Sequence, residues 1–285
     1  MLALVGHRIA GEAWLRILEW RPIPDSAALK DVSATAQQID IRLQQFCYWP
    51  IQYLTLRKRR TDWGSVTNSH PEYIRFYNSL WLVANDIIIG IAIGSYIIEN
   101  SDYVAGQVES IVDSWFIEGL QRMICWLMGY PGGLKLNEDL AQFLGDLFLW
   151  IIDYWAECMQ SIRPLLPHVI RVIGFSSFAG ASMPISLFSD LLSVLTIHVY
   201  AFYIASARIY NWQLTIIVSF LLPTIGVFYA TFAGARMGII AFKAALDTWL
   251  ACLNHFPLFA LMLRIKDSRR LPGKRTSATG IRTFF

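Results

Sequence analysis

The chain has 285 residues, of which 55% are hydrophobic and only 16% are charged, with a formal net charge of +3. Soluble domains carry about 25% charged residues, whereas several stretches of about 20 residues here contain at most one or two ionisable groups. The composition therefore excludes an ordinary soluble domain. It predicts an all-α, polytopic helical membrane protein with about four to six transmembrane helices plus interfacial amphipathic helices. The four cysteines are scattered and form no CxxC pair, which argues against a disulfide scaffold and against a zinc site.

The N-terminal region is mixed in polarity and only locally amphipathic. Ile39, Leu43 and Phe46 recur at positions i, i+4 and i+7, which predicts a helix running toward Pro50. A short helix lying on the membrane surface and a partner-binding helix both fit this pattern. No signal-peptide pattern precedes it, so we expect the first true span to serve as the insertion signal.

The first predicted span covers residues 80–98 and carries Asp86 near its start. Gly90 and Gly94 lie four residues apart within it. This small-xxx-small pattern lets two helix backbones approach closely. The span is therefore a candidate for tight helix packing.

An acidic stretch at residues 99–139 follows, and we expect it on the lumenal side, with an amphipathic middle portion lying along the membrane interface. Beyond it, further spans are predicted at the strongest apolar runs, which are residues 140–156, 186–207 and 215–234. Two weaker segments, 165–183 and 238–256, either cross the membrane or lie in its interface. Four crossings follow if both lie flat, and six follow if both cross.

Basic residues gather at 57–60 and in the C-terminal tail. The positive-inside rule places both clusters in the cytosol, which requires an even number of crossings. The predicted division is a cytosolic region with amphipathic helices at 1–79, a transmembrane region at 80–258 and a basic cytosolic tail at 259–285. Next to hydrophobic spans, such clusters set topology or touch anionic lipid more often than they bind nucleic acid.

Two carboxylates and one histidine are the candidates for intramembrane chemistry. Asp146 and Asp153 are seven residues apart and share one face of a helix, where paired carboxylates serve acid–base work, cation movement or hydrogen-bonded packing. His198 stands alone in its span and is either a structural residue or a ligand. A transporter that uses these three residues as a polar path is the alternative function. The sequence contains no acidic D-x-D-type motif, P-loop, GxGxxG, GxSxG or HExxH, so we predict no catalytic residue, metal site or cofactor.

Five blocks, in order, resemble one family. They are WLVANDIIIGIAIGSYIIEN at 81–100, GDLFLWIIDYW at 145–155, GFSSFAGASMPISLFSDLLSVLTIHVY at 174–200, FLLPT at 220–224 and LNHFPLFAL at 253–261. Together they closely resemble fungal members of the N-acetylglucosaminyl transferase component of glycosylphosphatidylinositol (GPI) anchor synthesis, the PIG-Q family. The resemblance covers roughly residues 37–273.

The resemblance implies a non-catalytic subunit of the endoplasmic-reticulum complex that transfers N-acetylglucosamine from UDP-GlcNAc to phosphatidylinositol. In this family, catalysis is assigned to another subunit. The implied partners are the other subunits, including the catalytic one, and membrane lipid, with no nucleic acid. The implied location is the endoplasmic-reticulum membrane, with several crossings and both termini cytosolic. An integral-membrane glycosyltransferase in its own right is a third possibility, which the missing acidic motif disfavours. Helix packing or complex contacts are then the expected role of the embedded polar and small residues, namely Asp86, Gly90, Gly94, Asp146, Asp153, His198, Asn254 and His255.

Two departures from the family pattern stand out. The family usually continues after Tyr210 with a polar, basic stretch, whereas here Asn211 to Thr215 runs straight into the next apolar run. After Gly273 the family commonly continues with another glycine and a hydrophobic tail, whereas here Lys274 begins an unlike sequence. Both changes fall where a docking loop or tail is expected.

Overall fold

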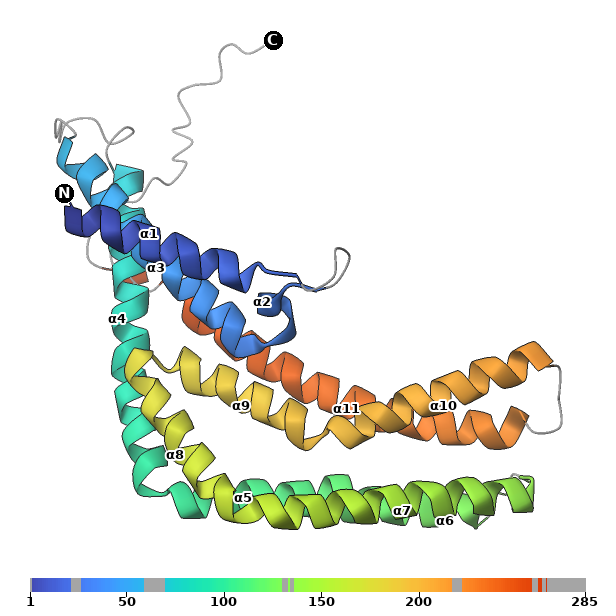
Figure 1. The fold of residues 1–285 in the computed structure, drawn as a ribbon. Helices are drawn as coiled ribbons and strands as arrows, with labels where there is room; N and C mark the ends of the chain where they lie inside the picture. The colour runs from blue at the N-terminus through green and yellow to red at the C-terminus, as the bar shows by residue number, and fades with distance from the viewer. Residues whose placement is uncertain are drawn as a thin grey trace, which may run out of the picture. The chain divides into compact units, whose positions relative to one another are not determined.

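A computed structural model describes residues 2–21, 27–58, 70–129, 133, 136–216, 222–257, 261–262 and 265. Every regular element among these residues is a helix (Figure 1). The predicted all-α class is therefore confirmed. The chain divides into two compact units, one formed by Met1–Ile88 with Ala251–Phe285 and the other by Ile89–Leu250.

The first unit is built around α3 (Ala34–Lys58). Helix α1 (Leu2–Leu18) packs along it, and the short α2 (Leu29–Val32) connects the two. The first part of α4 (His70–Glu99) belongs to the same unit, where Trp49 Nε1 on α3 donates a hydrogen bond to Ser79 Oγ at 3.0 Å. Helix α3 continues through Pro50 to Lys58, eight residues beyond the point toward which the sequence pattern runs.

The second unit opens with a helical hairpin. Helix α5 (Ser101–Ile111) passes through the π-helical turn η1 (Val112–Ile117) into α6 (Glu118–Met128), and α7 (Glu138–Ile162) returns antiparallel against α6 (Figure 1). Asn137 begins α7, because its side chain accepts a hydrogen bond from Leu140 N at 3.1 Å. The acidic stretch predicted as a lumenal loop is thus largely helical.

The remaining chain adds η3 (Arg163–Leu165), α8 (Leu166–Ser176), η4 (Ser177–Ala179), α9 (Ser182–Leu195), α10 (Ile197–Ile216) and α11 (Leu222–His255). The main core of the unit lies where α7 meets α10 and α11. There the ring of Phe148 contacts those of Phe202, Phe228 and Phe232 at centroid distances of 5.2, 6.1 and 4.7 Å.

Two helices in the described part of the chain are long and apolar enough to cross a membrane, at Tyr73–Glu99 in α4 and Pro223–His255 in α11. Helices α9 and α10 meet at a 52° bend and supply a third candidate if they count as one broken span. The predicted helical membrane protein is confirmed with two or three candidate spans.

The two weaker segments do not form separate crossing helices. Residues 165–183 are divided among η3, α8 and η4, and α8 has 11 residues, a length of roughly 17 Å against a hydrocarbon core of about 30 Å. Residues 238–256 continue α11 without interruption, so the expected break after Gly234 is wrong. A single continuous helix of this kind counts as one candidate span. The expected tail, residues 259–285, lies outside the described residues except at 261–262 and 265.

Candidate functional site: a buried polar network on α3, α4 and α11

Helix α3 turns a polar face inward in the first unit. Gln38 and Arg42 lie one turn apart and are buried, whereas Ile39 and Phe46, on the apolar face, are exposed. This arrangement is the reverse of a soluble amphipathic helix, whose apolar stripe faces the core. A helix at a membrane can leave its apolar side to lipid and keep its polar side for protein contacts.

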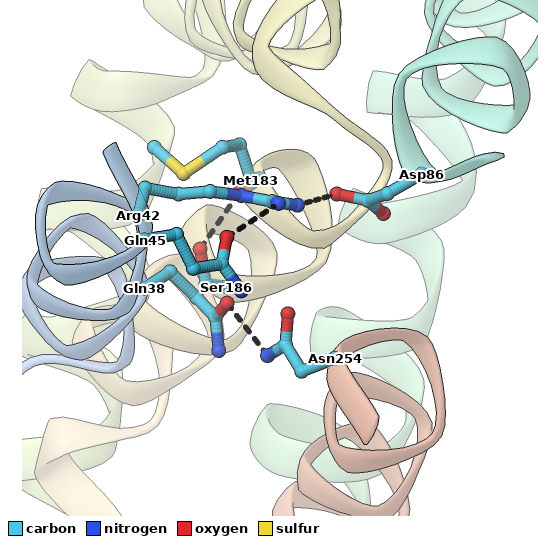
Figure 2. A network of polar contacts seen from close by, with 7 residues as sticks. All are labelled: Gln38, Arg42, Gln45, Asp86, Met183, Ser186 and Asn254. Carbon is cyan, nitrogen blue, oxygen red and sulfur yellow. Dashed lines mark hydrogen bonds and ion pairs between the residues drawn. The ribbon is translucent and has the colours of Figure 1, made fainter. Parts of the chain in front are cut away.

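The centre of the network is an ion pair between Arg42 on α3 and Asp86 on α4 (Figure 2). The Arg42 Nη2 group donates to Asp86 Oδ2, and the two side chains are only 10% and 1% exposed. Burial lowers the pKa of the Arg42 guanidinium, but the ordinary pKa of arginine is so high that the group stays protonated. The Arg42 Nη1 group also donates to Gln45 Oε1 at 3.2 Å. The pair is therefore a fixed charge contact between two helices.

The end of α11 is joined to the same helix. Asn254 Nδ2 donates a hydrogen bond to Gln38 Oε1 at 2.9 Å, and both side chains are buried (Figure 2). This contact connects residues 216 positions apart in the chain. The neighbouring His255 is exposed and lies outside the network. Of the two adjacent candidates, only Asn254 contributes to the junction.

Gly90 and Gly94 lie in the second unit, where α4 passes the turn between α8 and α9. A Cβ atom at Gly90 would lie 2.6 Å from Ala181 N, and one at Gly94 would lie 2.8 Å from Gly174 O. At both positions it would also collide with Ser177. The two glycines therefore permit a backbone approach that any larger residue would prevent.

The three candidates of the polar path do not converge. Asp146 and Asp153 lie on the exposed side of α7, and Asp153 Oδ1 accepts a hydrogen bond from Gln121 Nε2 at 2.7 Å. His198 is buried instead, with Nε2 3.0 Å from Phe116 O and its ring stacked 5.2 Å from that of Trp155. The structure therefore gives the carboxylates and the histidine different surroundings.

The network joins helices that lie far apart in the sequence. The contacts described above are one ion pair and hydrogen bonds of amide side chains, and each joins residues of the first unit. Within the described ranges, no group of three or more His, Cys, Asp or Glu side chains is placed to hold a metal ion. The sequence pattern points to Asp86 and Asn254 but not to their partners Arg42 and Gln38. The one available signal was that these two polar residues lie four apart on a single face of α3.

Comparison with known proteins identifies the family. The family model described as N-acetylglucosaminyl transferase component (Gpi1) matches residues 36–220 and 216–273. This chain belongs to that family. Its Gpi1-family match includes all four residues that join the helices, with Gln38, Arg42 and Asp86 in the first stretch and Asn254 in the second.

Several curated relatives are similar to the chain. The N-acetylglucosaminyl-phosphatidylinositol biosynthetic protein gpi1 of Schizosaccharomyces pombe is 41% identical over 93% of this chain and 46% of its own length. The phosphatidylinositol N-acetylglucosaminyltransferase subunit GPI1 of Saccharomyces cerevisiae is 32% identical over 86% of this chain and 50% of its own length. The human phosphatidylinositol N-acetylglucosaminyltransferase subunit Q is 28% identical over 81% of this chain and 37% of its own length. The chain thus spans half or less of the length of these relatives. No solved structure matches it.

The Gpi1-family match is split where a departure from the family was expected. Its two stretches meet at residues 216–220, just after the expected position of the missing polar segment. The alignment with the Schizosaccharomyces pombe protein is 303 residues long, although this chain has 285. The relative therefore contains residues that have no counterpart here, which agrees with a shortened connection.

Proposed function

We propose that this chain is a non-catalytic subunit of the endoplasmic-reticulum complex that transfers N-acetylglucosamine from UDP-GlcNAc to phosphatidylinositol, the first step of GPI-anchor biosynthesis. The family match over residues 36–273 carries the proposal. The yeast and human relatives are named as subunits of phosphatidylinositol N-acetylglucosaminyltransferase, which supports the same assignment.

The proposed mechanism is scaffolding. The embedded groups Asp86, Asn254 and His198 each make a polar contact with another helical segment of the chain, which supports a packing role. Packed helices of this kind would position the catalytic subunit at the cytosolic leaflet, where its lipid acceptor lies. The candidate packing and interface residues from the sequence are part of this proposal.

For topology, we propose four crossings, the lower end of the expected range. Helix α4, the bent pair α9–α10 and helix α11 supply three. We assign the fourth to helix α7, which is less apolar than the three candidate spans, because its 25 residues are long enough to cross and its core residues pack beside α11. An even number keeps residues 1–79 and the tail at 259–285 in the cytosol and places 99–139 in the lumen.

Co-purification and complementation test the assignment. The tagged chain is expressed in Schizosaccharomyces pombe cells that lack their own relative, with the full-length relative as the positive control. We expect the chain to recover the catalytic subunit from solubilised membranes and to restore formation of N-acetylglucosaminyl-phosphatidylinositol in microsomes. A chain that is stably inserted in the membrane but never recovers the catalytic subunit would contradict the scaffold function.

A further inference from the structure

Helix α7 has two unlike faces. Its inner face belongs to the core of the second unit, through Phe148 and Ile152. Its outer face carries a line of exposed apolar and aromatic side chains at positions i, i+4, i+7 and i+11, which are Phe143, Leu147, Trp150 and Tyr154. Aromatic residues such as Trp, Tyr and Phe are enriched in protein–protein interfaces.

Two carboxylates lie beside that stripe. Asp146 and Asp153 are exposed on the same side of α7, one turn before and one turn after Trp150. Asp153 reaches Gln121, but Asp146 has no hydrogen bond or ion pair with any residue that the structure describes. We call Phe143, Asp146, Leu147, Trp150, Asp153 and Tyr154 the outer α7 face.

The depth of this face follows from the packing of the opposite side. Phe148 is two residues from Asp146 and contacts Phe228 and Phe232, which belong to the apolar part of candidate span α11. The two aspartates therefore lie at the level of that span. Lipid tails cover the aromatic stripe well, but they offer no partner to a carboxylate. Contact with lipid alone would therefore leave the carboxylates of this face without a partner.

We infer that the outer α7 face docks a transmembrane helix of another subunit, one that carries Lys or Arg side chains about seven residues apart. Such a helix places one cation opposite each aspartate, since the acids have the same spacing. Its apolar residues pack between the cations against Trp150 and Tyr154. This inference rests on the proposed function, because it names the surface through which the chain holds the complex.

Charge reversal in the assembled complex tests the surface. The tagged double variant D146K/D153K is purified from the same cells as the wild type and compared for recovery of the catalytic subunit and of every other subunit. We expect the recovery of at least one subunit to fall about tenfold or more, because like charges then face each other. The matched control D247K reverses an exposed carboxylate of α11 and should leave recovery unchanged.

A photocrosslinking amino acid at position 150 provides the second measurement. Trp150 and Trp249 are equally exposed, at 67% and 68%, so position 249 on α11 is a matched site. We expect position 150 to crosslink to a transmembrane segment of a subunit that contains Lys or Arg, and position 249 not to reach that segment. Crosslinks from position 150 only to lipid or to a second copy of the chain would overturn the inference. So would unchanged recovery with D146K/D153K. If the wild type recovers no subunit at all, the proposed function itself has failed instead.

Discussion

Removing one member of the Arg42–Asp86 pair is the sharpest test of the buried network. The side chains are 10% and 1% exposed, so Asp86→Ala leaves a guanidinium buried without its counter-ion. Breaking a buried ion pair in this way costs about 3–5 kcal/mol. For a chain of this size, each kcal/mol lowers the melting temperature by about 2 °C or slightly more. We therefore expect D86A to melt at least about 6 °C below the wild type.

The assay is thermal unfolding in detergent, followed by the fluorescence of the 11 tryptophans. The double variant R42M/D86L removes both charges, and we expect it to recover to within about 1 kcal/mol of the wild type, because apolar pairs replace buried ion pairs well. Glu12→Ala is the control, since its pair with Arg8 is about half exposed and is worth only about 0.3–0.5 kcal/mol. If R42M/D86L loses as much stability as D86A, or more, the reasoning is refuted.

Two further predictions concern packing and amide pairing. Gly94→Val should destabilise the fold by about 1–3 kcal/mol or more, because the new side chain meets Ser177. The control Gly106→Ala lies in open space and should be neutral or slightly stabilising, and thermal melting of the two variants measures the difference. Asn254→Ala should cost about 1–3 kcal/mol by leaving its buried amide partner unpaired, whereas His255→Ala, on an exposed side chain, should change stability by less than about 0.5 kcal/mol in the same assay.

The helical membrane class could be predicted because it depends on local hydropathy alone. The first span was expected at 80–98, and the candidate span runs Tyr73–Glu99. Its N-terminal extension was missed because residues before 80 are mixed in polarity. The continuity of α11 was missed for a different reason. Arg236 lies between the segments 215–234 and 238–256, which were expected to be separate. In the structure its guanidinium lies 4.2 Å from the centre of the Tyr200 ring, so the charge has a partner without ending the helix.

The site was half predictable. A carboxylate inside an apolar run indicates a contact, which is how Asp86 was predicted. Its partner, however, lies far away in the sequence, and the local pattern does not identify it. Arg42 lies 44 residues earlier, on a helix whose apolar periodicity drew attention to the opposite face. Periodicity locates a helix and divides its faces. It does not say which face packs against protein when lipid is a possible neighbour for the other.

The polar residues of the apolar helices fall into two groups with different physical consequences. Asp86 and Asn254 each make a buried polar contact inside the chain, so their loss should lower stability whether or not any partner is present. Asp146 is exposed and has no hydrogen bond or ion pair with any described residue. Its charge therefore contributes no contact to the isolated chain. Its substitution by Asn should therefore leave thermal unfolding of the purified chain unchanged and weaken the assembled complex. A stability loss from Asp146→Asn equal to that from Asp86→Ala would erase this distinction and place both carboxylates in the same internal framework.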